Sequence, residues 1–170
     1  MSKPDRKWMK INTSLMNLED KWQSRIISVE DAAILAELMD MAYQGTIDHE
    51  GETLDQCLEE MRGTLGGKYG AFLNFASFCA ISDNAAISAS IVTFYKGIPL
   101  LAYSMTSPDF QGKGIGRYLI ERSIDALAKH GYPDFYLVVT SGNRPAENLY
   151  ARVGFKYLGS AKPGDAPPIA

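Results

Sequence analysis

Three alternating glycines restrict what this chain can fold into more than any other feature of its sequence. Gly112, Gly114 and Gly116 are separated by single residues. The segment before them, 100–106, is apolar and predicts a strand, and the segment after them, 115–130, has apolar residues at helical spacing. Glycine lets successive backbone N–H groups turn toward one point, and a helix start adds partial positive charge there. The order of strand, glycine turn and helix therefore predicts a backbone site for a phosphate or pyrophosphate.

Two nucleotide-binding motifs use similar physics but differ in spacing. The Rossmann fingerprint is G-x-G-x-x-G with an acid after the second strand. The glycines here run G-x-G-x-G, and Asp134 precedes the next predicted strand, 135–139. A P-loop would need Gly-Lys-Ser/Thr at the end of the turn, which the sequence lacks. A nucleotide-binding α/β protein and a glycine-rich connection without a ligand are the alternatives to a pyrophosphate site.

The length and hydropathy of the chain predict one folded domain with a flanking segment at each side. Its 170 residues, 46% hydrophobic and 22% charged, are ordinary for a globular domain. We expect the domain over 25–159. Residues 1–24 form an N-terminal extension that could be an extra helix or a frayed arm, and the proline-containing residues 160–170 form a flexible tail.

Within that domain, helical and strand patterns alternate. The predicted elements are a strand over 25–29, a helix capped by Asp31, a helix opened by Thr53, strands over 75–82, 85–95 and 100–106, a helix over 115–130, a strand over 135–139, a short helix over about 145–152 and a last strand over 155–158. The run 135–139 is continuously apolar, which predicts a central strand covered on both faces.

A second group of polar residues lies beyond this strand. Asn143 and Tyr150 are seven residues apart, close to two helical turns, so they share one side of a helix with Ala146 and Glu147 between them. This face can line a ligand. Alternatively, Asn143 caps the helix and Tyr150 is a half-buried aromatic residue.

Together, the two groups resemble the GNAT superfamily of CoA-dependent N-acyltransferases. Residues 111–116 match its Q/R-x-x-G-x-G/A pyrophosphate motif, and Asn143, Ala146 and Tyr150 with a closing Gly-Phe at 154–155 match its second signature. The specific resemblance covers about 100–158. It implies an α/β fold with a mixed, mostly antiparallel central sheet of about six to seven strands, flanked by helices, with a splay between the two central parallel strands.

The resemblance also implies acetyl-CoA as the acyl donor. Asn143 would bind its pantetheine arm, Tyr150 would protonate the leaving thiolate, and backbone N–H groups around Met105 and Thr106 would stabilise the oxyanion. The expected cofactor contacts are Met105, Thr106, Gln111, Gly112, Lys113, Gly114, Ile115, Gly116, Arg117, Asn143, Ala146 and Tyr150. The implied reaction is direct attack by a primary amine, on a small molecule or a protein, in a ternary complex. A non-catalytic acyl-CoA sensor is the alternative.

The group that removes the amine proton is not identified by the motifs. Some relatives carry a Glu on the strand before the glycine turn, but residues 100–106 contain no acid or His. The nearest candidates lie in the loop 44–52, and Glu147 is a weaker one; each is also explained as an ordinary surface charge. The candidate bases of the loop are Asp48, His49, Glu50 and Glu52. The candidate acceptor contacts are Tyr43, Asp48, His49, Glu50 and Tyr103.

Charge and cysteine content argue against several other functions. A net charge of −3 with a pI near 5.4 gives no basic footprint for nucleic acid. The polar first ten residues and the lack of a long apolar run predict a cytoplasmic protein without membrane association. Cys57 and Cys79 are too isolated for a disulfide framework or a zinc site, so we expect no metal. By resemblance, a homodimer is consistent with the sequence.

Overall fold

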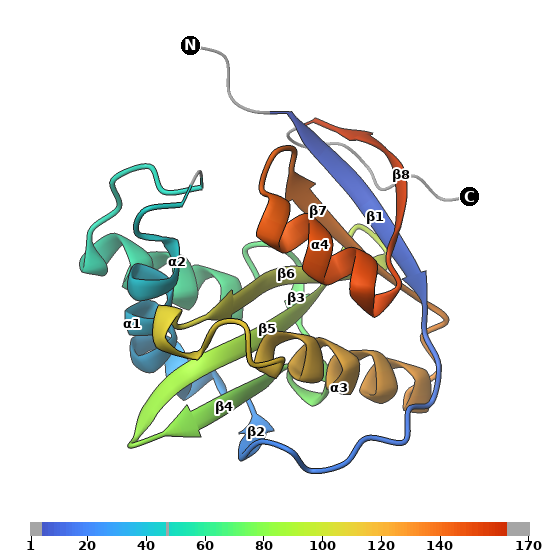
Figure 1. The fold of residues 1–170 in the computed structure, drawn as a ribbon, viewed down its shortest axis with the longest axis horizontal. Coiled ribbons are helices and arrows are strands. Elements are labelled where there is room, and N and C mark those ends of the chain that lie inside the picture. The colour runs from blue at the N-terminus through green and yellow to red at the C-terminus, as the bar shows by residue number, and fades with distance from the viewer. Residues whose placement is uncertain (1–4, 47, 163–170) are drawn as a thin grey trace.

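The computed structural model describes residues 5–46 and 48–162, which form an eight-stranded sheet with helices on both faces (Figure 1). The strands are β1 (Arg6–Asn12), β2 (Ser24–Ile26), β3 (Ala71–Phe72), β4 (Phe78–Ser82), β5 (Ala85–Tyr95), β6 (Ile98–Thr106), β7 (Asp134–Thr140) and β8 (Lys156–Ala161). The helices are α1 (Ala32–Tyr43), α2 (Leu54–Leu65), α3 (Ile115–Lys129) and α4 (Arg144–Val153). Short 3-10 turns occupy Val29–Asp31, Asn74–Ala76 and Pro108–Phe110.

The sheet is mixed and mostly antiparallel, as the sequence predicted. Its order is β2-β4-β5-β6-β7-β1-β8, with β3 paired to β5. Only β6 and β7 are paired in parallel among the described strands. The sheet has one strand more than the upper expectation; β1 and the two-residue β3 were not among the strands predicted by residue range.

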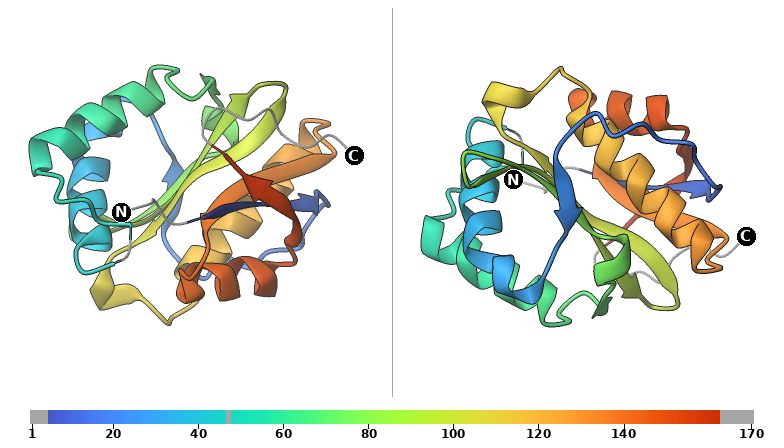
Figure 2. Two further views of the ribbon diagram at one scale, coloured as in Figure 1. Left: turned by 90° about the horizontal axis from the view of Figure 1, so that it is seen from above. Right: turned by 90° about the horizontal axis from the view of Figure 1, so that it is seen from below.

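Helices lie on both faces of this sheet (Figure 2), and the two larger of three hydrophobic clusters lie beneath them. Helices α1 and α2 cover one face, where Leu35, Leu38 and Met61 are fully buried. Helix α3 covers the other face with Leu119 and Leu127, and α4 lies beside it. Each fully buried side chain of this size contributes about 1.5–3 kcal/mol relative to exposure, so the two layers hold the central strands firmly.

The N-terminal segment is neither of the two structures left open by the sequence. Residues 6–12 form β1, which pairs antiparallel with β7 on one side and β8 on the other. Trp8 and Met9 are both buried, on opposite faces of the strand: Met9 in the core under α3, and Trp8 in the smaller third cluster with Ile98 and Tyr136. The charged residues around them gave no alternating apolar pattern. This strand is therefore specified by its tertiary partners rather than by its own propensity.

Several element boundaries also differ from the sequence prediction. The strand expected over 25–29 is β2, Ser24–Ile26, and the first part of 75–82 is the 3-10 turn Asn74–Ala76. Asp31 makes no side-chain cap to α1; its carboxylate accepts from the Ser28 N–H and pairs with Arg25. At the other end, β8 extends to Ala161, and residues 163–170 of the expected tail lie outside the described residues.

The predicted splay between the central parallel strands begins at a β-bulge. Strands β6 and β7 pair only at Leu100 with Tyr136 and at Leu101 with Leu137. The next residue of β6, Ala102, is the extra residue of a bulge against β5. A bulge bends its strand, so beyond this point β6 follows β5 while β7 follows β1, and the two strands diverge (Figure 1).

Candidate active site

The glycine turn lies at the diverging end of β6, and its three glycines serve two different purposes. Gly112 has φ of 77° and Gly114 has φ of 84°, in the left-handed region that other residues avoid. Gly116 has ordinary helical backbone, but a Cβ there would lie 3.1 Å from Thr106 Oγ1. The first two glycines therefore shape the turn, and the third lets α3 approach the end of β6 closely.

This turn leaves backbone donors of α3 open to a ligand. The first N–H groups of an α-helix have no partner within the helix, and Gly114 supplies no side-chain cap. The Ile115 side chain is buried in the core and anchors the helix start, so only its backbone can face a ligand. Lys113 lies over the Phe110 ring at 5.2 Å, and Arg117 is 3.5 Å from a carboxylate oxygen of Glu121. An anion at this end would meet backbone N–H groups and two cationic side chains.

The register of β6 separates the roles of its last residues. The Ser107 N–H donates to the Ile87 carbonyl at 2.8 Å. Hydrogen-bonded pairs recur at every second residue of an antiparallel ladder, so the backbone of Met105 faces β5 as well. Its carbonyl also accepts from the Ser88 hydroxyl at 3.0 Å. The backbone of Thr106 and Ser104 consequently turns toward the gap. Of the two residues expected to supply the oxyanion donor, Thr106 is the better placed.

Gln111 closes the connection between β6 and the glycine turn. Its side-chain Nε2 donates to the Thr106 carbonyl at 3.2 Å. The Thr106 hydroxyl in turn lies 2.9 Å from the Ser88 hydroxyl on β5. These contacts fix the end of the strand, so Gln111 serves the shape of the turn through its side chain.

Tyr150 reaches the gap from α4 and meets β6 there. Its ring packs edge-on against Phe155, with 6.1 Å between the centroids. Burial raises the pKa of Tyr150 to about 12; the nearby Ser104 hydroxyl opposes this, and the charge of Asp48 adds to it. The phenol is therefore protonated at neutral pH and able to donate a proton.

Asn143 both caps α4 and bonds the loop between α1 and α2. Its Oδ1 accepts from the Ala146 N–H at 3.4 Å, which is the helix-cap role allowed by the sequence. Its Nδ2 donates to Asp48 Oδ2 at 2.9 Å, and the Thr140 hydroxyl donates to Asp48 Oδ1 at 2.8 Å. Asp48 thus spans from its loop to the end of β7 and the start of α4.

The remaining residues of the candidate set make local contacts, Glu50 through its backbone N–H. His49 Nδ1 lies 3.4 Å from Glu52 Oε2, which also accepts from the Glu50 N–H at 3.0 Å. Glu147 accepts from the Gly142 N–H at 2.9 Å and lies 3.3 Å from the Lys7 ammonium of β1. The hydrogen bond from Gly142 is the main reason that the pKa of Glu147 is lowered. These contacts hold the loop and the α4 start, respectively.

On the α1–α2 face, Tyr103 bonds a carboxylate, Glu60, that the sequence analysis did not predict, and Tyr43 lies near Tyr103. The Tyr103 hydroxyl donates to Glu60 Oε1 at 2.7 Å, and the Tyr69 hydroxyl donates to the same oxygen at 2.6 Å. Lys68 Nζ bonds the other oxygen at 2.8 Å. Burial raises the pKa of Tyr43 and of Tyr103 well above the usual range. Tyr43 adds to the shift of Tyr103, and Tyr150 and Asp48 add to that of Tyr43.

One signal in the sequence could have revealed Glu60. Helix α2 buries Cys57, Met61 and Thr64, and position 60 falls on the same face at helical spacing. An acid among core positions of an amphipathic helix needs a polar partner. Tyr103, 43 residues away on β6, supplies one, and no local pattern could connect the two.

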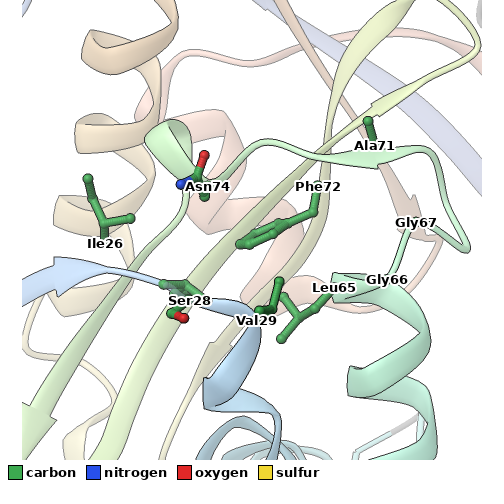
Figure 3. A pocket seen from close by; sticks show the side chains of 10 residues that line it. Ile26, Ser28, Val29, Leu65, Gly66, Gly67, Ala71, Phe72 and Asn74 are labelled. Carbon is green, nitrogen blue, oxygen red and sulfur yellow. The ribbon is translucent and has the colours of Figure 1, made fainter.

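A separate hollow lies at the far end of α2 (Figure 3). It is lined by Ile26, Ile27, Ser28, Val29, Leu65, Gly66, Gly67, Ala71, Phe72 and Asn74. None of the predicted site residues is among them. Within the described ranges, no cluster of three or more metal-ligating side chains occurs, and no helix is long and apolar enough to cross a membrane.

The splayed parallel pair, with a glycine turn at its open end, is the arrangement implied by the resemblance to the GNAT class of acyl-CoA-dependent transferases. Comparison with known proteins leads to the same class. The model of the Acetyltransferase (GNAT) family matches residues 48–155, well over half of the chain. The chain therefore belongs to the GNAT acetyltransferase family. Enzymes of this family use acetyl-CoA.

Two curated relatives match this chain over short stretches. Streptothricin acetyltransferase of Streptomyces lavendulae is 40% identical over 53 residues, which are 31% of this chain and 28% of that protein. The ribosomal protein bS18-alanine N-acetyltransferase of Escherichia coli K12 is 44% identical over 48 residues, 28% of this chain and 32% of that protein. The chain thus matches about a third or less of the length of these curated relatives.

A solved structure extends the likeness to most of the chain. It is the PaiA N-acetyltransferase of Thermoplasma acidophilum in complex with coenzyme A, with a TM-score of 0.61 and 19% sequence identity. The alignment covers 82% of this chain and 98% of that one. At this identity the likeness concerns the fold.

Proposed function

We propose that this protein transfers the acetyl group of acetyl-CoA to a primary amine by direct attack in a ternary complex. The observation that carries the proposal is that the uncapped α3 start and the Tyr150 hydroxyl lie at the same open end of the β6–β7 pair. A pyrophosphate bound at the first would direct the thioester toward the second. Family membership supports the acyl donor.

In this proposal the donor is held mainly by backbone. Residues 112–117 bind the pyrophosphate, with Lys113 and Arg117 as added cations. Asn143 and Ala146 line the pantetheine arm, which requires the Asn143 amide to leave Asp48 or to share it. The backbone N–H of Thr106 stabilises the oxyanion, and Tyr150 protonates the leaving thiolate.

The acceptor is proposed only as a primary amine, on a small molecule or a protein. The two named relatives act, by their names, on streptothricin and on an alanine of a ribosomal protein, so the shared motifs do not determine the acceptor. In this chain the side chains on the acceptor side are Tyr43, Asp48, Tyr103 and Glu60, which favour a cationic amine. His49 and Glu50 belong to the rim of that side. A cytoplasmic location and a homodimer stay predictions.

The test is release of free thiol from acetyl-CoA against a panel of diamines, amino acids and peptides, with acetyl-CoA binding measured in parallel. Amine-dependent release by the wild type supports the proposal. Tight CoA binding without release on any amine would leave the non-catalytic sensor. A melting temperature raised by NAD or ATP but not by CoA would instead indicate a nucleotide-binding protein.

A further inference from the structure

The carboxylate of Glu60 is the centre of a hydrogen-bonded cluster between α2 and β6. Its Oε1 accepts from Tyr103 at 2.7 Å and from Tyr69 at 2.6 Å, and its Oε2 lies 2.8 Å from Lys68 Nζ. Burial alone would raise the pKa of Glu60, but the three hydrogen bonds outweigh it and the pKa lies below the ordinary value. The carboxylate is held ionised in a partly buried place, with about a quarter of its side chain exposed (24%).

Tyr103 connects this cluster to the acyl-transfer site. It follows the bulged residue Ala102 and precedes Ser104, which is near enough to Tyr150 to lower the pKa of that phenol. Alternation along β6 puts Tyr103 on the α1–α2 face and Ser104 on the opposite face of the same gap. Tyr43, at the end of α1, lies close enough to Tyr103 to raise the pKa of that hydroxyl, and its own pKa is raised in part by Tyr150.

The orientation of the Tyr103 hydroxyl determines what it can offer to a substrate. Its proton is donated to Glu60, so its oxygen lone pairs are left to accept a hydrogen bond. An acceptor ammonium approaching the thioester from the α1–α2 face would find such an oxygen. No acid or His on β6 could serve this purpose, since the strand sequence Ile98–Thr106 contains none.

We propose, building on the acetyltransferase function above, that Tyr103 and Glu60 form the route by which the acceptor ammonium loses its proton. One N–H bond of the ammonium breaks, its electron pair stays on nitrogen, and the proton forms an O–H bond with Tyr103 Oη. At the same time the original Tyr103 O–H bond breaks and that proton bonds to Glu60 Oε1. The neutral amine then attacks the thioester carbonyl, and Glu60 releases its proton to solvent at its exposed edge. Tyr103 touches the substrate, whereas Glu60 acts through Tyr103 and is a positioning residue.

This route defines the acceptor more narrowly as an amine that arrives protonated, such as an alkylammonium. The ordinary pKa of such a group is about 10.4, so it needs a proton acceptor at neutral pH and none when the solution is more alkaline. The lowered pKa of Glu60 keeps it from retaining the proton. The titratable groups that face the pair from the surrounding elements are Tyr43, Cys57, Lys68 and Tyr69.

The test is the pH profile of kcat/KM for Glu60→Gln and Tyr103→Phe with the best alkylamine of the panel. Both variants keep the side-chain shape. We expect a loss on the order of a hundredfold at pH 7, narrowing to a few-fold near pH 10, where the amine is itself becoming neutral. Tyr150 stays protonated over this range, because its pKa is about 12. Tyr69→Phe is the matched control; it removes the other tyrosine bond to the same oxygen, and its profile should run parallel to that of the wild type.

Two outcomes would overturn the relay without touching the proposed function. One is a loss in Glu60→Gln and Tyr103→Phe that is the same at every pH, which a distorted site would produce. The other is a Tyr69→Phe profile that changes like theirs, because the effect would then belong to the charge cluster as a whole. A wild type that transfers acetyl to no amine would instead overturn the proposed function. Thermal melts and acetyl-CoA affinity of each variant confirm that it is folded.

Discussion

The two faces of the splayed sheet present different chemical groups, backbone on one and side chains on the other. On the α3–α4 face, the proposed donor site consists mainly of backbone: positive-φ glycines, uncapped N–H groups at the α3 start, and the end of β6. On the α1–α2 face, the proposed acceptor site consists of side chains, with Tyr103 and Glu60 at its centre. A backbone site suits one unvarying cofactor, whereas a side-chain site can differ between relatives that share the same fold.

Replacing Tyr150 tests whether the two faces meet at one reacting centre. Tyr150→Phe removes the proton donor but keeps the ring against Phe155. We expect kcat to fall about a hundredfold while acetyl-CoA affinity is unchanged, as measured by steady-state kinetics and calorimetry. Tyr157→Phe is the control, because this side chain is 61% exposed on β8. Wild-type turnover in Tyr150→Phe would exclude the tyrosine from the chemical step.

Alanine at the glycine turn tests the backbone character of the donor face. Gly114 and Gly131 flank the two ends of α3, both have positive φ, and a Cβ would meet nothing within 4 Å at either. Each Gly→Ala change should therefore cost about 1 kcal/mol of stability through strain. Only Gly114→Ala should also weaken CoA binding, by about tenfold, since a distorted turn loses at least one charge-assisted bond. Equal CoA affinity in the two variants would contradict a backbone cradle.

The pH dependence of stability examines the acceptor face. The pKa of Glu60 is lowered in the folded protein, so its carboxylate stabilises the fold above the ordinary value of 4.5. That contribution is lost as the pH falls through the lower folded pKa. The deficit of Glu60→Gln relative to wild type in urea unfolding should thus be largest at neutral pH and should shrink in acid. Glu59→Gln, on the exposed side of α2, should show no such trend.

The smallest expected effect concerns Asp48, whose carboxylate joins the loop after α1 to Thr140 and Asn143. Asp48 is the last of the causes that raise the pKa of Tyr150. Asp48→Asn should therefore lower the ionisation midpoint of Tyr150 modestly from about 12, observed as the ultraviolet difference titration against the same variant carrying Tyr150→Phe. Glu50→Gln in the same loop is the control. An unchanged midpoint would place Asp48 outside the electrostatic reach of the tyrosine.

The same contrast explains how much could be read from the sequence. The glycine turn, α3, β7 and the Asn143–Tyr150 helix follow from spacings of a few residues, so the donor face was predictable. The contacts of Ser104 and Thr140 were not predicted, because they depend on strand register. The role of Glu60 was not predicted, because its partner Tyr103 lies on β6. Strand β1 was not predicted, because it pairs with β7, which is distant in the sequence. Long-range pairing leaves no periodic trace in a segment as charged as residues 6–12.

The position of β1 also has a consequence for how the chain is made. It is synthesised before the other described strands, whereas both of its partners, β7 and β8, come after all of the other described strands. Until then Trp8 and Met9 have no sheet to cover them, and such sequence-distant pairings slow folding. The final closure of the sheet, and with it the support behind β7, must therefore wait until β7 and β8 have been synthesised.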